Sequence, residues 1–103
     1  MDLYTMLGID TEDPKQQQAE LIVSADEKML DELRSMRIAN GLSLDDVAER
    51  MGLSAGYVLG IENGTRDPHL STMRRYVHAV GAVIQHQVLL APGISSAGAP
   101  EEQ

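Results

Sequence analysis

The stretch "GLSLDDVAERMGLSAGYVLGIENGT", residues 41–65, contains two short helical patterns on either side of a tight turn. Ser43 and Ser54 each stand just before a pattern, where a hydroxyl can accept a hydrogen bond from a free backbone N–H of the first helical turn. Gly52 lies between the patterns, and Asn63-Gly64 is a typical helix exit. The segment therefore predicts two short capped helices joined by a turn.

Apolar residues at helical spacing would hold these two helices at a fixed angle. We assign six of them to packing against the rest of the chain: Val47, Ala48, Met51, Leu53, Val58 and Ile61. The outward positions of the second helix are small or apolar, whereas solvent-facing positions of a helix are usually polar. The packing residues are thus expected to be structural, and any binding function is expected to reside on the outward positions.

Flanking residues predict further helices. Asp13-Pro14 is a cap followed by proline at the first helical position, which opens a short helix to about Val23. A capping-box pattern at 24–27 starts a second helix, which Asn40-Gly41 ends. Pro68 precedes a last helix over roughly residues 70–80, with Gly81 as its stop. The fold class is therefore mainly α, with four to five helices.

The segment "AVIQHQVLL", residues 82–90, changes from helical to alternating periodicity. Alternation with β-branched residues predicts a strand, although a fifth helix is the competing interpretation. A lone strand has two unpaired edges, so we expect it to pair with the same strand of a second copy about a two-fold axis. The small, polar and Pro/Gly-rich residues 92–103 are expected to be disordered.

Composition limits the class of protein. A chain of 103 residues is expected to form one domain with tails. It has no cysteine, which excludes disulfides and cysteine zinc sites and fits a reducing cytoplasm. Neither a signal sequence nor an apolar run of membrane-spanning length is present, so we expect a cytoplasmic protein with no membrane partner.

The net charge of -8 argues at first against nucleic acid, because neutralisation of phosphates drives such binding. The acidity is uneven, however. Residues 1–32 hold nine acidic residues against two lysines, whereas residues 33–90 hold six arginines against five acidic residues. The middle of the chain is therefore compatible with a DNA partner, and residues 1–24 form an acidic extension.

Residues 33–81 resemble the Cro/C1-type (Xre) helix-turn-helix family, through Gly41-Leu42-Ser43, Val47-Ala48, Gly52-Leu53-Ser54, Val58, Ile61-Glu62-Asn63-Gly64 and Pro68. The resemblance implies a lambda-repressor-like bundle over residues 25–81, followed by a dimerisation strand over 82–91. It also implies an internal salt bridge between Arg37 and Glu62. The ending "LSTMRRYVHAVGAVIQHQVLL" looks more narrowly like Xre-type antitoxins of the HigA kind, in which such a strand helps dimerisation.

In this family the second helix of the motif reads DNA, and its flanks touch the sugar-phosphate backbone. Carried onto this chain, the candidate DNA-binding residues are Ser43, Leu44, Ser54, Ala55, Gly56, Tyr57, Leu59, Gly60, Thr65 and Arg66. The family often has Gln, Arg, Ser or Thr on the outward face, whereas alanine and glycine here offer no side-chain hydrogen bond to a base. The two glycines also cost roughly 1 kcal/mol each relative to alanine in a helix.

Three interpretations of this face stay open. Small residues could let the helix backbone approach the groove floor, with Leu59 and Ala55 on thymine methyls and the Tyr57 hydroxyl on a phosphate. Base reading could instead come from the following loop, through Thr65, Arg66 and His69. The face could also have become a protein-binding surface, which apolar side chains would suit.

The sequence thus predicts a sequence-specific repressor that binds a double-stranded DNA operator as a homodimer. One alternative is an autoregulating antitoxin whose acidic residues 1–24 bind a basic toxin. The other is a protein-interaction module on a helix-turn-helix scaffold that has lost DNA readout. No catalytic motif and no metal-ligand spacing among the three histidines is present, so we expect no enzyme, no metal and no cofactor.

Overall fold

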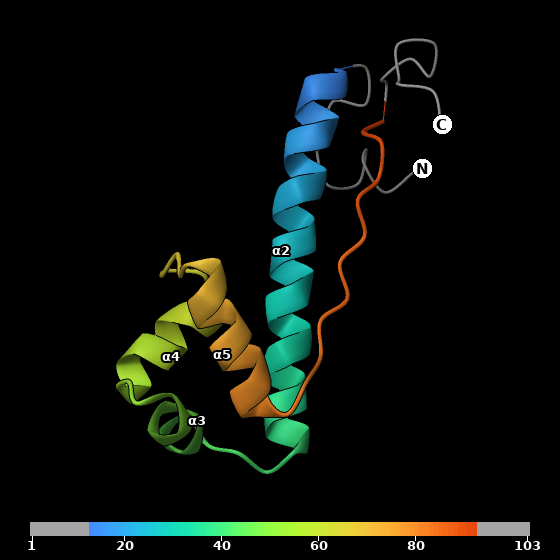
Figure 1. The fold of residues 1–103 in the computed structure, drawn as a ribbon. Helices are drawn as coiled ribbons and strands as arrows, with labels where there is room; N and C mark the ends of the chain where they lie inside the picture. Colours follow the sequence, from blue (N-terminus) through green and yellow to red (C-terminus); the bar gives the residue numbers. More distant parts are fainter. Residues whose placement is uncertain (1–12, 93–103) are drawn as a thin grey trace. The chain divides into compact units, whose positions relative to one another are not determined.

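The structure, a computed structural model, describes residues 13–92 (Figure 1). The elements in that range are four helices: α2 (Pro14–Ala39), α3 (Leu44–Met51), α4 (Ala55–Glu62) and α5 (Leu70–Val80). Residues 26–86 form one compact unit, which contains α3, α4, α5 and the C-terminal part of α2. The described residues before 26 and after 86 belong to a second unit. The mainly α fold class is therefore confirmed.

Helix α2 begins where the sequence predicts. The Asp13 carboxylate accepts a hydrogen bond from the Lys15 backbone N–H at 3.0 Å, and Pro14 occupies the first helical position. The predicted break at Ser24 is wrong, because the helix continues to Ala39. Neither glycine nor proline interrupts residues 15–39, so a capping pattern within this run has no helix end to cap.

Helices α3 and α4 are capped as predicted. The Ser43 hydroxyl accepts from the Asp46 N–H at 3.0 Å while the Asp46 carboxylate accepts from the Ser43 N–H at 2.8 Å. The Ser54 hydroxyl accepts from the Tyr57 N–H at 3.1 Å. Gly52 takes the left-handed conformation between the two helices, with φ of 69°. These local bonds fix the turn that carries α4.

The capping box should make stability depend on acid. The hydrogen bond from the Ser43 backbone N–H holds the pKa of Asp46 below its ordinary value of 3.8. Because the folded pKa is the lower one, the contribution is present above pH 3.8 and is lost as the pH falls through the folded value. We expect the urea concentration at half-unfolding to fall less between pH 6 and pH 3 for Asp46→Asn than for the native chain. Asp45→Asn, on the adjacent exposed residue, is the control, and equal acid sensitivity in all three proteins would contradict this assignment.

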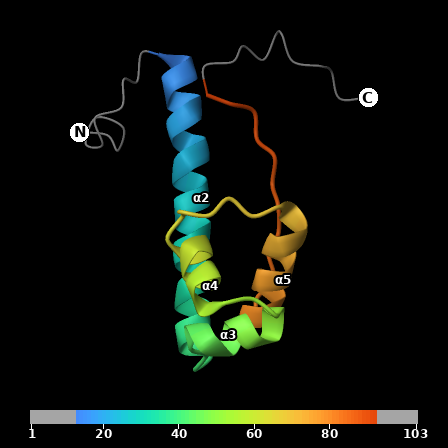
Figure 2. The ribbon, with the colours of Figure 1, turned by 90° about the vertical axis from the view of Figure 1, so that its left-hand side faces the viewer.

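The core lies where α3, α4 and α5 pack beside the C-terminal part of α2 (Figure 2). Its buried apolar side chains are Leu33, Val47, Ala48, Met51, Val58, Ile61, Tyr76, Val77, Ala79 and Val80. Five of the six packing residues expected in the motif are among them, and Leu53 packs against the cluster while partly buried. Leu70, the first residue of α5, lies outside this core and is 73% exposed.

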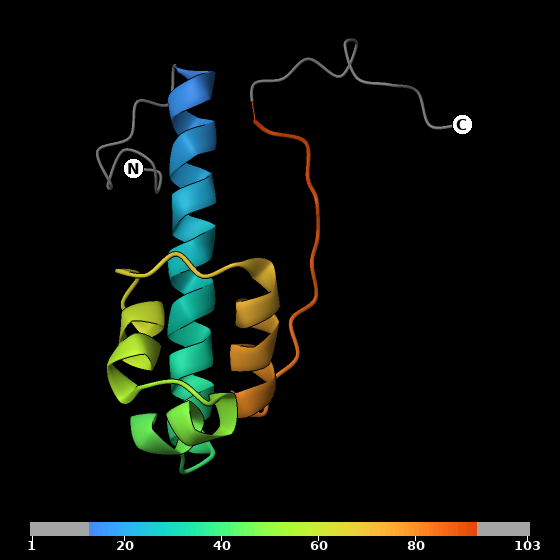
Figure 3. The same cartoon turned by 60° about the vertical axis from the view of Figure 1, so that its left-hand side comes forward.

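The predicted strand at 82–91 does not form in the described chain. Residues 83–91 contain neither strand nor helix, and Figure 3 shows them leaving α5 as an irregular segment. The Ala82 N–H donates to the Val77 carbonyl, and Ile84 packs against the core, whereas Val88 is 97% exposed. A strand needs a neighbouring strand with which to pair, and a single copy offers this segment none among the described residues. The predicted tail at 92–103 lies, beyond residue 92, outside the described residues.

Within residues 13–92, none of the helices combines the length and apolar character that crossing a membrane requires.

Candidate nucleic-acid interface

Helix α4 presents a narrow outward face. Its first turn carries Ala55, partly buried against the core, and Gly56, which is exposed. Tyr57 is partly buried, and Leu59 is 46% exposed. Val58 and Ile61 point inward and are almost fully buried. The face that remains is slim and apolar, as the sequence predicts, so a partner could approach the helix backbone closely.

Gly60 differs from the expectation of an outward position, because it is buried. The Arg66 side chain covers it: a Cβ added at Gly60 would lie 2.5 Å from Arg66 Cγ. The Arg66 backbone N–H also donates to the Gly60 carbonyl at 3.0 Å. Gly60 is therefore explained by packing, since any side chain there would displace Arg66.

Arg66 is positioned beside the aromatic ring of α4. Its guanidinium carbon lies 4.7 Å from the centroid of the Tyr57 ring, a cation–π geometry. Both residues leave polar groups accessible, because Arg66 is exposed and Tyr57 is only partly buried. We call this pair, together with Gly60 beneath it, the Tyr57–Arg66 platform. It places one positive charge at the outward side of α4.

The loop after α4 is ordered by Asn63. Its side-chain oxygen accepts from both the backbone N–H and the hydroxyl of Thr65, at 3.0 and 2.8 Å. Gly64 takes a φ of 78°, which permits the sharp exit. Thr65 is exposed, and its hydroxyl proton is already donated to Asn63. The hydroxyl oxygen can still accept a hydrogen bond from a partner.

The residues that flank the two helix starts divide into exposed and packed positions. Ser43 and Ser54 are exposed, and each hydroxyl oxygen accepts a capping bond while its O–H stays available to donate. Leu44 is partly buried and packs against the core, so it contributes to the fold as well as to the surface. Each of the ten predicted site residues thus lies at or near α4, its loop, or the start of α3.

A buried ionic cluster fixes the far end of α4. The Glu62 carboxylate accepts from Arg37 Nε at 2.7 Å and from Arg37 Nη2 at 3.1 Å. It also accepts from the Tyr76 hydroxyl at 2.7 Å, and Arg37 Nη1 donates to the Leu42 carbonyl at 2.8 Å. The implied Arg37–Glu62 salt bridge is therefore confirmed, and Tyr76 is a third member. The cluster ties α4 to both α2 and α5.

The electrostatics of this cluster follow from its hydrogen bonds. The hydrogen bond to the Glu62 carboxylate is the main cause that raises the pKa of Arg37. Burial, followed by the hydrogen bond to Glu62, raises the pKa of Tyr76, so its phenol stays protonated and keeps donating. Within the described residues no buried side-chain nitrogen or oxygen lacks a hydrogen-bond partner. The cluster is fully satisfied and serves to position α4.

Comparison with known proteins places this arrangement in a family. The model of a helix-turn-helix domain matches residues 29–88. The chain belongs to this helix-turn-helix family. Neither the curated proteins nor the solved structures give a match. Helices α3 and α4 are the two helices of the motif, and in such domains the second helix enters the major groove while the first crosses the backbone. The family thus indicates a DNA-binding regulator.

Sequence reasoning missed three features of this helix-turn-helix protein. Tyr76 donates to Glu62 at 2.7 Å, a contact across fourteen positions that no helical spacing in the sequence suggests. The contact between Arg66 and Tyr57 spans nine positions with no helical spacing to suggest it. Arg50 donates to the Ala79 carbonyl at 2.9 Å, so it bonds to the C-terminal end of α5.

No group of three or more His, Asp or Glu that could hold a metal lies in the part of the chain that is described.

Proposed function

We propose that this helix-turn-helix protein is a sequence-specific transcriptional regulator of the Cro/C1 (Xre) type, which places α4 in the major groove of an operator and represses by occupancy. The single observation that carries this proposal is the Tyr57–Arg66 platform beside the slim face of α4. A face without side-chain bulk supports close backbone approach. The platform supplies a positive charge for a phosphate at the outward side of α4.

Specificity would come from shape, apolar contacts and spacing. Leu59 and Ala55 offer contacts to thymine methyl groups, and the hydroxyls of Ser43, Ser54 and Tyr57 offer phosphate contacts. Few direct base contacts mean modest affinity per copy, so a dimer is part of the proposal. Two copies would present their α4 helices about 34 Å apart, one turn of DNA.

The dimer would form through residues 82–91. Val83 and Val88 are exposed apolar side chains on a segment that has no strand partner among the described residues. Pairing with the same segment of a second copy would satisfy the backbone donors and acceptors and bring apolar side chains of the two copies into cross-strand contact. The acidic residues 1–24 would then be an appendage, acting in the cytoplasm as an extension or as the toxin-binding segment of an antitoxin.

Arg66→Ala tests the platform. Removal of one phosphate contact should weaken binding to all DNA sequences alike and reduce the slope of log affinity against log salt by about one unit. The measurement is a salt series of fluorescence-anisotropy titrations with the promoter of the protein's own gene and with unrelated duplex. Arg34→Ala, an exposed arginine on α2, is the matched control and should leave the slope unchanged.

Gly60→Ala tests the same platform by changing the residue that the Arg66 side chain covers. Alanine should favour the helix by roughly 1 kcal/mol over glycine, but its Cβ would displace Arg66 from Tyr57. The variant is therefore expected to weaken DNA binding as Arg66→Ala does. Binding that is unaltered in both variants would remove the platform from the interface, and no salt-dependent binding by the native chain would favour the protein-interaction module.

A further inference from the structure

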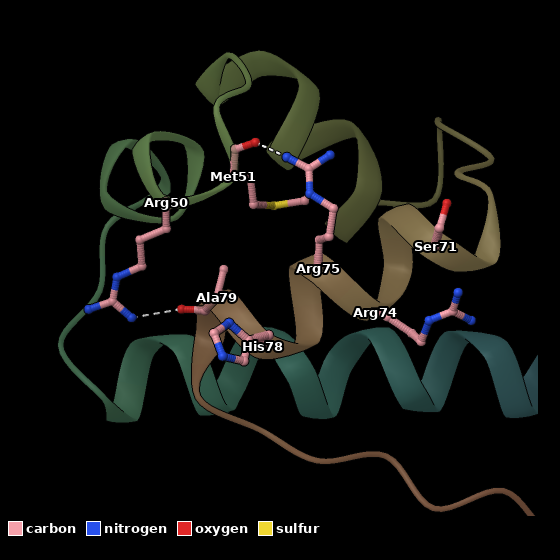
Figure 4. Close-up of a pocket in the computed structure, with 7 residues that line it drawn as sticks. All are labelled: Arg50, Met51, Ser71, Arg74, Arg75, His78 and Ala79. Carbon is pink, nitrogen blue, oxygen red and sulfur yellow. Dashed lines mark hydrogen bonds between the residues drawn. The ribbon is translucent and has the colours of Figure 1, made fainter.

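A basic groove lies between the C-terminal end of α3 and one side of α5 (Figure 4). It has a volume of about 650 Å³, within the range of small-molecule sites. Three of the six arginines of the chain line it, and no acidic residue does. Such a concentration of positive charge stands out in a protein of net charge -8. The basic groove is lined by Arg50, Met51, Ser71, Arg74, Arg75, His78 and Ala79.

Two of the guanidinium groups are held in place by helix ends. Arg50 Nη1 donates to the Ala79 carbonyl at 2.9 Å, and Arg75 Nη2 donates to the Met51 carbonyl. These carbonyls lie in the last turns of α5 and α3, where cations are favoured. Each guanidinium has five N–H groups, so most of its donors remain for a ligand. Fixed donors lose less conformational entropy when a ligand binds.

The third arginine has no such tie. Within the described residues Arg74 makes no hydrogen bond or ion pair that would neutralise it, and its side chain is exposed. Ser71, Arg74, Arg75 and His78 recur at the i, i+3, i+4, i+7 spacing of one helix face, so α5 lines the groove with polar groups along its length. The buried side chains Met51 and Ala79 provide the apolar floor.

Figure 4 shows the three guanidinium groups spread along the groove rather than gathered at one point. A single small anion could meet one of them, whereas a chain of anionic groups could meet several through paired N–H···O bonds. None of the lining residues belongs to α4 or to the loop after it, so the groove is built from other residues than those on α4 and its loop that form most of the proposed DNA face. We propose that the basic groove binds a small, extended ligand that carries two or more phosphate groups.

The test uses the full chain and sodium tripolyphosphate as the probe, at ionic strength held constant with sodium chloride. Backbone amide NMR should show saturable shifts in residues 50–51 and 71–79, and the melting temperature should rise with probe concentration. Arg74→Gln, which breaks no internal hydrogen bond, should raise the dissociation constant for tripolyphosphate roughly fivefold. Arg34→Gln removes an exposed arginine outside the groove and should leave that constant unchanged.

Three results would overturn the inference. The first is the absence of saturable shifts, because the groove would then not bind the probe. The second is equal weakening by Arg74→Gln and Arg34→Gln, because the probe would then be sensing only overall charge. The third is a decrease of about one unit in the salt slope of DNA binding for Arg74→Gln, because the groove would then hold DNA phosphates. Tripolyphosphate binding that persists when the chain binds no operator would support the groove and count against the proposed function alone.

Discussion

Glu62→Ala is expected to lower the free energy of unfolding by about 3–5 kcal/mol, the cost of removing one partner from a buried ion pair. The carboxylate accepts three of the four hydrogen bonds of the cluster, two from nitrogens of Arg37 and one from Tyr76. Without it, the buried guanidinium keeps only the Leu42 carbonyl as an acceptor, and the fully buried phenol has none. Small domains are stable by about 5–15 kcal/mol, so much of the variant should be unfolded at moderate urea concentrations.

Urea unfolding followed by circular dichroism measures this effect. Glu49→Ala, which removes an exposed acid from α3, is the matched control and should change stability by no more than about 0.5 kcal/mol. Replacing the whole cluster at once, as Arg37→Met, Glu62→Leu and Tyr76→Phe, should recover most of the loss, because no polar side chain of the cluster is left unpaired and only the partly buried Leu42 carbonyl loses a donor. A loss below about 1 kcal/mol for Glu62→Ala would mean that water reaches Arg37 and Tyr76 and that the cluster is not a buried anchor.

The helix boundaries around the motif could be predicted because their causes are local. Ser43 and Ser54 bond to backbone groups three residues away, and Gly52 and Gly81 adopt the left-handed conformation that few other residues tolerate. The same reasoning failed at Ser24, where a local capping pattern competes with a long run free of helix breakers. Local chemistry identifies a possible helix end, but continuity of the helix depends on the whole run.

The candidate site was predictable in part for a different reason. The positions on α4 follow from helical periodicity and from the family resemblance, and the exposed or half-buried states of Tyr57 and Leu59 agree with it. The burial of Gly60 was not predictable, because it depends on where the Arg66 side chain lies after an irregular loop. Contacts that close across a loop have no period in the sequence, and the role of Tyr76 on Glu62 escaped for the same reason.

The structural role of the buried side of α4 and the binding role of its exposed side can be distinguished by a pair of alanine variants. Ile61, with 1% of its side chain exposed, packs against the core, whereas Leu59 on the same helix is 46% exposed. Ile61→Ala is expected to lower the unfolding free energy by about 2–5 kcal/mol, through lost burial and a cavity that the short α4 cannot close. Its DNA binding should fall in proportion to the unfolded fraction at the assay temperature.

Leu59→Ala is expected to leave the unfolding free energy within about 0.5 kcal/mol of the native value. If its side chain meets thymine methyl groups, operator binding should weaken by about 1–2 kcal/mol, with little change on unrelated duplex. Urea unfolding and anisotropy titrations on the same two preparations give both quantities. Unaltered operator affinity in stable Leu59→Ala would exclude Leu59 from the contact surface, whereas equal loss on both duplexes would show that it supports the helix and does not discriminate between bases.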